Sequence, residues 1–134
     1  MKNFQFQIEL DVRDYECDMQ GIVNNSVYQN YFEHTRHKYL KSIGLDFSTL
    51  TEKKINLIVI RAEIDYKGSL RSGDSFISSL NMTRVSPLRF GFEQFIYRKS
   101  DNVLMTKALV IGTSVNAKGR PQLPEELIKV LGME

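Results

Sequence analysis

The chain has 134 residues, which suits one domain of ordinary size and argues against a multidomain protein. With 42% hydrophobic and 25% charged residues, its composition is that of a globular protein and argues against extensive disorder. The formal net charge is +2, and the basic residues are scattered singly or in pairs. This pattern argues against nucleic-acid binding and suits a small anionic ligand or an ordinary solvated surface.

The first predicted elements are a strand and a loop. Residues 4–13 alternate apolar and polar side chains without a break, which predicts a half-buried strand. Residues 14–25 lose this alternation and gather polar and turn-forming side chains around Gly21, so they predict a loop. The loop leads directly into a helix.

The helix is marked at its start by Ser26 and Gln29, a candidate capping box, although Asn25 could cap it instead. Helical spacing gathers the apolar side chains on one wide face, which we expect to be buried. This face comprises Val27, Tyr28, Tyr31, Phe32, Thr35, Tyr39 and Ile43. Gly44 predicts the end of the helix, and one short helical turn is expected at residues 48–52.

The second half of the chain predicts four long strands and a short helix. The strands are expected at residues 55–66, 74–85, 88–98 and 103–115, which are rich in β-branched and aromatic residues. Their short separators favour antiparallel hairpins, because parallel neighbours need longer crossovers. A last helix is expected from Pro124 to Leu131, with Gly132 as its stop.

This order predicts a single α+β domain over residues 1–134, in which a five-stranded antiparallel sheet wraps its apolar face around the long helix. Strands of this length leave exposed edges, which are commonly paired or covered. We therefore expect an edge strand to pair with a second copy of the chain.

Asp18 is the candidate functional side chain of the loop. It lies seven residues before Asn25, in a glycine-containing loop that ends at the predicted helix start. Unpaired backbone N–H groups at a helix N-terminus favour negative charge. A carboxylate beside such donors is the combination that acyl transfer needs. On pattern alone, an aspartate that caps the helix or solvates a turn is the commoner interpretation.

The stretch from Asp18 to Tyr28, DMQGIVNNSVY, resembles the active-site signature of hotdog-fold thioesterases of the 4-hydroxybenzoyl-CoA thioesterase type. The resemblance continues along almost the whole chain, at Tyr31-Phe32-Glu33, Arg36, Ile64-Asp65-Tyr66, Gly73-Asp74, Phe92, Gly119-Arg120-Pro121 and Leu123-Pro124. It implies a hotdog fold and hydrolysis of an acyl thioester, usually acyl-CoA, at a homodimer interface. It implies no metal and no cofactor, because CoA is part of the substrate.

The resemblance also implies roles for residues of the loop and the helix. Asp18 stands at the position of the catalytic carboxylate, which either attacks the thioester carbonyl or activates a water. The backbone N–H at or near Asn25, together with Gly21, would bind the thioester oxygen. The acyl pocket would be shaped by Val23, Asn24, Tyr28 and Tyr31.

The sequence departs from its relatives at two loop positions. Ile22 and Asn25 stand where different relatives carry a histidine, so Asp18 would act without an imidazole from this loop.

Arg84 and Arg89 lie near where relatives often place groups that meet the phosphates of CoA, and guanidinium suits phosphate well. The alternative for both arginines is an ordinary solvated position at a hairpin, without a role in phosphate binding.

Three further observations bear on localisation and metal binding. The single cysteine, Cys17, can form neither an intramolecular disulfide nor a cysteine-based zinc site. No window approaches the roughly 18 to 20 apolar residues of a membrane helix, and the start has no apolar signal-peptide core. His34 and His37 lie opposite the apolar helix face, which favours a surface position over a metal site. We expect a cytoplasmic protein that binds no membrane.

The sequence therefore predicts a cytoplasmic acyl-CoA thioesterase that acts as a homodimer or a dimer of dimers. Two alternatives remain. One is an acyl-ACP thioesterase of the same fold, in which acyl carrier protein replaces CoA. The other is a non-catalytic acyl-CoA-binding module, because a fold alone does not establish an activity.

Overall fold

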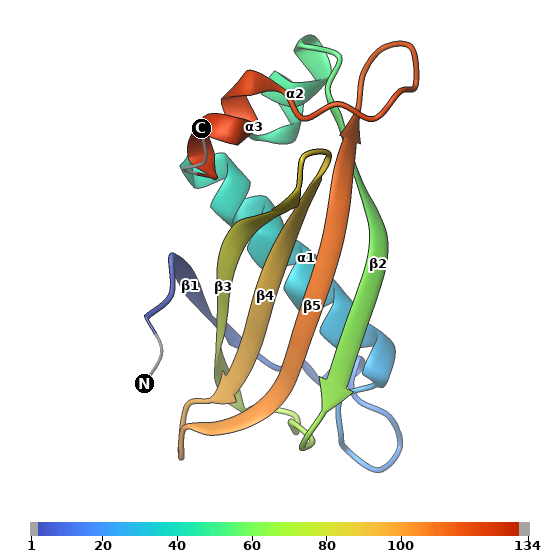
Figure 1. The fold of residues 1–134 in the computed structure, drawn as a ribbon. Helices are drawn as coiled ribbons and strands as arrows, with labels where there is room; N and C mark the ends of the chain where they lie inside the picture. Colours follow the sequence, from blue (N-terminus) through green and yellow to red (C-terminus); the bar gives the residue numbers. More distant parts are fainter. Residues whose placement is uncertain (1–2, 132–134) are drawn as a thin grey trace.

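The computed structural model describes residues 3–131 (Figure 1). Its elements, in chain order, are β1 (Phe6–Asp11), the 3₁₀ turn η1 (Asp14–Glu16), α1 (Asn25–Ser42), α2 (Phe47–Glu52), β2 (Asn56–Tyr66), β3 (Ser75–Ser86), β4 (Arg89–Arg98), β5 (Val103–Val115) and α3 (Glu125–Val130). Every predicted strand and helix is present, so the α+β prediction is confirmed. The predicted stop at Gly132 lies outside the described residues.

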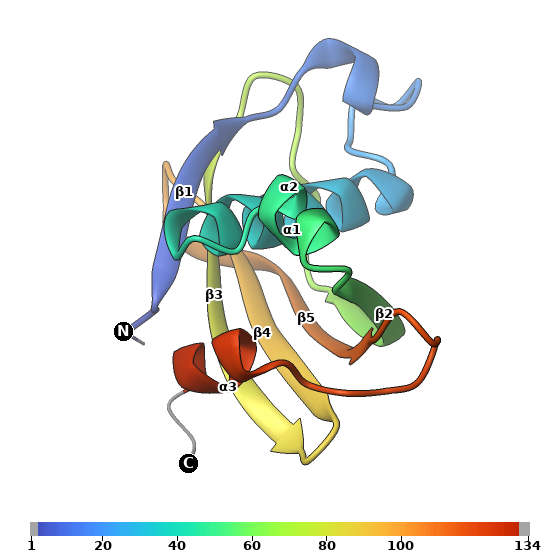
Figure 2. The same ribbon diagram turned by 90° about the horizontal axis from the view of Figure 1, so that it is seen from above.

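The strands form one antiparallel sheet in the order β1-β3-β4-β5-β2. The sheet curves around α1, which lies along its concave face (Figure 2). The strand after the long helix, β2, therefore pairs with the last strand, β5, and lies at one edge of the sheet. β1 lies at the other edge, beside β3.

The core lies between α1 and the inner face of the sheet. Side chains at helical spacing on α1 are buried against β3 and β4, whose fully buried members include Phe76, Leu80 and Ile96. The predicted helix face is confirmed at Tyr28, Tyr31, Phe32, Thr35 and Tyr39, and Val27 and Ile43 pack at its margin. Apolar burial of this face holds α1 in place.

The start of α1 differs from the prediction. The helix begins at Asn25 with Asn24 as its N-cap, so Ser26 lies inside the helix and the predicted capping box of Ser26 and Gln29 is wrong. Two long-range backbone bonds explain the difference. The Asn24 N–H donates to the carbonyl oxygen of Glu16 at 3.1 Å, and the Val23 N–H donates to that of Leu70 at 2.9 Å. These bonds hold the chain extended as far as Asn24, and the helix starts immediately afterwards.

The end of α1 agrees with the prediction. Gly44 has φ +81°, a left-handed conformation that glycine adopts without a steric cost. The N–H of Leu45 then donates to the carbonyl oxygen of Leu40 at 2.8 Å, which satisfies one of the last carbonyl groups of the helix. Among residues 3–131, no helix is both long and apolar enough to cross a membrane.

The two edge strands are built differently. β1 has six residues that alternate between half-buried and exposed. β2 has 11 residues, nine of them exposed, and its sequence is mainly apolar. Ile58, Val59 and Ile60 are 43%, 50% and 45% exposed. A long apolar edge of this kind invites pairing with another strand.

Candidate active site

The loop before α1 is a short hairpin that presents Asp18. The N–H of Asp18 donates to the carbonyl oxygen of Ile22, and the N–H of Gly21 donates to that of Asp18, both at 2.9 Å. Gly21 closes this turn at φ +79°, a conformation that a side chain would disfavour. Cys17 and Val23 form a bridge at the base of the hairpin.

The two oxygens of the Asp18 carboxylate differ in their hydrogen bonds. Its Oδ1 accepts from the N–H groups of Gln20 at 2.8 Å and Ile22 at 3.4 Å, which fixes the carboxylate on the loop. For Oδ2 no hydrogen bond is recorded within residues 3–131, and the side chain is exposed. One oxygen therefore has the turn role that is common for such aspartates, and the other is available for chemistry.

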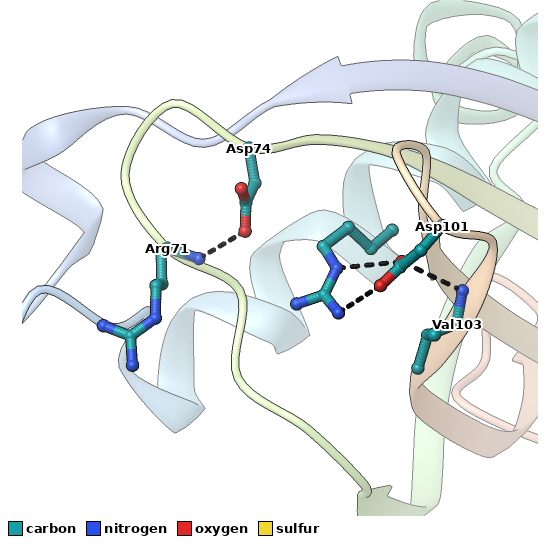
Figure 3. Close-up of polar contacts among 5 residues, drawn as sticks. Arg71, Asp74, Asp101 and Val103 are labelled. Atoms are coloured by element: carbon teal, nitrogen blue, oxygen red, sulfur yellow. Dashed lines mark hydrogen bonds and ion pairs between the residues drawn. The ribbon is translucent and has the colours of Figure 1, made fainter.

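Neighbouring carboxylates are engaged in structural contacts. Asp14 accepts a hydrogen bond from Ser72, and Asp74 Oδ2 accepts from the N–H of Arg71 at 2.9 Å (Figure 3). Asp101 pairs with the guanidinium of Arg98, and these hydrogen bonds hold the pKa of Asp101 below its usual range. Among these groups, Asp18 is therefore the carboxylate best placed to act as a base or nucleophile.

A second segment, residues 68–74, braces the loop. Ile22 forms a bridge with Arg71, and the hydroxyl of Tyr28 accepts from the N–H of Leu70 at 3.0 Å. Figure 3 shows the Arg71 side chain pointing away from Asp74, whose carboxylate binds the Arg71 backbone. The hairpin is thus tied to the segment that leads into β3.

Glu16 is a structural residue of the site that sequence reasoning missed. It is 9% exposed, and its Oε1 accepts from the hydroxyl of Tyr31 at 2.8 Å and from the N–H of Arg13 at 2.9 Å. Burial, followed by this contact with Glu16, raises the pKa of Tyr31. Since the partner on α1 is 15 residues away, no local pattern distinguishes Glu16 from the other acids of the loop.

The N-terminus of α1 carries unpaired backbone donors. Asn24 has the extended conformation of an N-cap, but its side chain makes no capping hydrogen bond, and the first turn contains no acidic residue. Within the described chain, no acceptor is recorded for the N–H groups of Asn25 and Ser26. The hairpin therefore leads to a helix end whose amides can stabilise a developing oxyanion.

The residues predicted to shape an acyl pocket lie in different environments. Val23, Tyr28 and Tyr31 are 3%, 1% and 5% exposed and pack in the core, whereas Asn24 is exposed. None of them lines a hollow described here, so their pocket role stays a prediction. Two adjoining hollows of about 220 and 340 Å³ lie instead between α1 and β2, and a larger one of about 560 Å³ lies among α2, α3 and the end of β5.

Arg84 and Arg89 lie far from Asp18 within one chain. β3 starts beside the loop region at Ser75 and has 12 residues, so roughly 40 Å of strand separates the loop from the β3–β4 turn. The guanidinium of Arg84 donates to the carbonyl oxygens of Ser86 at 3.4 Å and Pro87 at 3.0 Å. Binding of CoA phosphates by these arginines stays a prediction.

The part of the chain that the structure describes contains no group of three or more His, Cys, Asp or Glu residues able to hold a metal. His34 is exposed on α1, and His37 is half-buried. Burial lowers the pKa of His37.

Comparison with known proteins shows the family. The model of the thioesterase-like superfamily matches residues 12–131. The chain is 35% identical over 115 residues to the chloroplastic acyl-acyl carrier protein thioesterase ATL3 of Arabidopsis thaliana, covering 86% of this chain and 60% of that protein. It is 30% identical over 120 residues to a putative esterase of Aquifex aeolicus, covering 90% and 92%. The chain thus spans about 60% of the length of the Arabidopsis relative.

A solved structure shows the same fold. The 1,4-dihydroxy-2-naphthoyl-CoA thioesterase Slr0204 from Synechocystis matches with a TM-score of 0.88 over 95% of each chain, at 19% identity. The fold implied by the sequence resemblance is therefore confirmed. Because the family model covers nearly the whole described chain, the protein belongs to the thioesterase-like superfamily.

Proposed function

We propose that the protein hydrolyses acyl-CoA to a free carboxylic acid and CoA. One observation carries this proposal: an anchored carboxylate with an available oxygen lies on a hairpin that leads to an uncapped helix N-terminus. The two halves of an acyl-transfer site, a base or nucleophile and oxyanion donors, are thus on adjacent segments. Family membership supports the same reaction class.

The geometry allows two routes. In one, Asp18 Oδ2 attacks the thioester carbonyl, the CoA thiolate leaves, and water hydrolyses the resulting anhydride. In the other, the carboxylate takes a proton from an attacking water and returns it to the departing thiolate. In both routes the amides of Asn25 and Ser26 stabilise the tetrahedral oxyanion. Neither route needs an imidazole or a metal.

The alternative acyl carrier is acyl carrier protein. The Arabidopsis relative is named as an acyl-acyl carrier protein thioesterase, and the Synechocystis structure as a CoA thioesterase. We propose CoA as the carrier, and a direct comparison decides between the two. The same acyl group is presented on CoA and on carrier protein, and the larger kcat/KM identifies the carrier.

We also propose that β2 pairs with β2 of a second copy, as a dimer or within a dimer of dimers. Antiparallel pairing centred on Ala62 sets Arg61 opposite Glu63 of the partner subunit, which is a favourable cross-strand pair. Centring the pairing on Arg61 instead would place Arg61 opposite Arg61 of the partner subunit, and centring it on Glu63 would place the two copies of Glu63 opposite each other. In sedimentation velocity, R61E should weaken the dimer and R61E combined with E63R should restore it. An unchanged dimer in R61E contradicts this register.

The experiment for the activity measures release of CoA thiol from short, branched, long and aromatic acyl-CoAs. Asp18→Asn is the matched variant, because its Oδ1 can still accept the loop hydrogen bonds while its amide is neither base nor nucleophile. Turnover by the native protein and at least a hundredfold loss in the variant support the proposal. If acyl-CoA binds to both proteins and neither turns it over, the binding-module alternative holds.

A further inference from the structure

Tyr66, the last residue of β2, reaches the start of α1 from the sheet. Its hydroxyl donates to the carbonyl oxygen of Asn25, the first residue of the helix, at 3.3 Å. The two residues are 41 positions apart in the chain, so the contact exists only once β2 lies beside the helix. Figure 1 shows the arrowhead of β2 beside the first turn of α1. The Tyr66 hydroxyl therefore lies at the helix end that carries the unpaired backbone donors.

The ring of Tyr66 is supported by a buried ring of α1. Its centre lies 5.7 Å from the centre of the Tyr28 ring, in an edge-on contact with an angle of 63° between the planes. Tyr28 is 1% exposed, and its hydroxyl accepts from the N–H of Leu70. Tyr66 itself is 43% exposed. A buried neighbour thus holds the ring, while part of the side chain remains open to a ligand.

The backbone around Tyr66 is also fixed. Tyr66 pairs with Thr106 of β5, and the N–H groups of Lys67 and Gly68 both donate to the carbonyl oxygen of Met105, at 2.9 and 3.0 Å. A Cβ atom at Gly68 would lie 2.8 Å from Cε of Met105, so the chain turns closely against β5 at this point. The hydroxyl of Tyr66 is therefore carried by a side chain and a backbone that are both held in place.

The carbonyl group that Tyr66 binds belongs to the same peptide group as the N–H of Ser26. The C=O of Asn25 and the N–H of Ser26 share one planar amide, in which electrons are delocalised from nitrogen to oxygen. A hydrogen bond donated to the oxygen favours this delocalisation, so the N–H becomes more positive and donates more strongly. Ser26 carries one of the two proposed oxyanion donors. Tyr66 can therefore act on this donor without contacting the substrate.

The peptide group between Asn25 and Ser26 receives little other support from the helix start. The Asn24 side chain makes no capping hydrogen bond, and the first N–H of the helix with a recorded acceptor in the described chain is that of Val27, which donates to the carbonyl oxygen of Asn24 at 2.9 Å. Because the amide is planar, a bond to its oxygen also determines where its N–H points. A donor that is oriented in advance stabilises an oxyanion without reorganisation during the reaction.

We propose that Tyr66 is a positioning residue of the thioesterase site, which orients and polarises the Asn25–Ser26 peptide group so that the Ser26 N–H stabilises the oxyanion. This inference rests on the proposed function and adds a residue to it. The 3.3 Å bond is long, as such bonds often are before substrate binds, and it should tighten when substrate excludes water. A stronger donor stabilises the transition-state charge more than the neutral thioester, so the effect should appear in kcat and not in KM.

The contact is tested first in the free protein. Tyr66→Phe deletes the hydroxyl and keeps the ring that packs on Tyr28. In ¹H–¹⁵N correlation spectra, the amide nitrogen of Ser26 should move to lower chemical shift in this variant, because its peptide group is less polarised. Tyr97→Phe, which deletes a hydroxyl on β4 and keeps a ring stacked on Phe95, is the matched control and should leave Ser26 unchanged. An unchanged Ser26 resonance in Tyr66→Phe overturns the proposal.

Steady-state kinetics then test the consequence for the reaction. In Tyr66→Phe, kcat should fall about two- to tenfold, because one oxyanion donor is weakened and not removed. KM should stay within about twofold, and Tyr97→Phe should match the native protein. A loss confined to KM, or an unchanged kcat, overturns the proposal. If the native protein hydrolyses no acyl-CoA, the proposed function has failed, and the Ser26 resonance still decides whether Tyr66 acts on this peptide group.

Discussion

The N-cap residues of helices α1 and α2 have the same extended backbone conformation, but only the N-cap side chain of α2 makes a capping hydrogen bond. Asn24 and Asp46 both precede their helices in extended conformations, with ψ 142° and 165°. The Asp46 carboxylate accepts from the N–H of Thr49 at 3.2 Å and caps α2. The Asn24 side chain, from a residue type equally able to cap, makes no such bond.

Helix length and packing explain how α1 can remain uncapped. α2 has six residues, with Leu50 packed in the core, and a helix this short depends on its cap to form. α1 has 18 residues and a buried face of six side chains, so tertiary packing holds it without a cap. The difference leaves the first amides of α1 available for a ligand, while those of α2 are partly satisfied by the protein.

The largest expected effect comes from deleting one open donor of α1. Asn25→Pro removes one N–H at the first helical position, where proline is tolerated, and the extended Asn24 is compatible with a following proline. We expect kcat to fall by about 10² to 10³ with little change in far-UV circular dichroism, as for the loss of one oxyanion donor. Asn25→Ala, which keeps the N–H, should retain most activity. Equal activity of both variants excludes this amide from the site.

A smaller loss of activity is expected from giving α1 the kind of cap that α2 has. Asn24→Asp places a carboxylate at the exposed N-cap, where the helix end attracts it. The added charge should occupy the amides and oppose an oxyanion, so kcat/KM falls roughly tenfold while the helix gains about 0.5 kcal/mol. Steady-state kinetics and urea unfolding measure the two effects. A variant that gains stability with full activity would show that these amides do not serve the reaction.

A loss of stability is expected from deleting the hydroxyl contact that supports the uncapped start of α1. Tyr31→Phe deletes the hydroxyl that donates to the buried Glu16, whose carbonyl oxygen in turn accepts from Asn24. Leaving this carboxylate short of a donor should lower the free energy of unfolding by about 1 to 3 kcal/mol. The urea midpoint reports the loss, and Tyr15→Phe, at a side chain that is 77% exposed, is the control. Matching midpoints for the two variants would mean that the Glu16 contact does not support the helix start.

The smallest effect is expected at α2. Hydrogen bonds from Thr49 hold the pKa of Asp46 below its usual value, so its stabilising effect is present at neutral pH and is lost as the pH falls through that lowered pKa. Asp46→Ala should therefore have a slightly lower Tm than the native protein at pH 7, and the two should converge as the pH falls below the lowered pKa. Thermal unfolding across this range tests the trend, and turnover should not change. A gap that widens in acid contradicts the capping role.

The sequence predicted the elements well where local periodicity determines them. Alternation identified the strands, and helical spacing identified the buried face of α1. The predicted start of α1 was two residues late. A local capping rule placed the N-cap at Ser26, whereas backbone bonds from Val23 to Leu70 and from Asn24 to Glu16 end the extended segment at Asn24. Long-range bonds of this kind leave no signature in the residues near Ser26.

The site was only partly predictable for the same reason. Asp18 and the helix start are close in sequence, so one motif contained both. The two hollows between α1 and β2 depend on β2 lying at the sheet edge beside α1, and hairpin lengths do not specify that β2 pairs with β5. Tyr28 and Tyr31, aromatic residues at helical spacing, pack in the core, where their hydroxyls bind the Leu70 backbone and Glu16 across distances that no local pattern reports.

The position of β1 beside β3 has a consequence for folding order. Asp11 meets Ser75 across a separation of 64 residues, and the hairpin of Asp18 follows β1 directly. Closing so long a loop is entropically costly and slow compared with forming local hairpins. During synthesis, the Asp18 hairpin therefore cannot reach its bracing segment until β3 has emerged from the ribosome. We expect the site to be organised late, and to exist only in molecules whose sheet is already assembled.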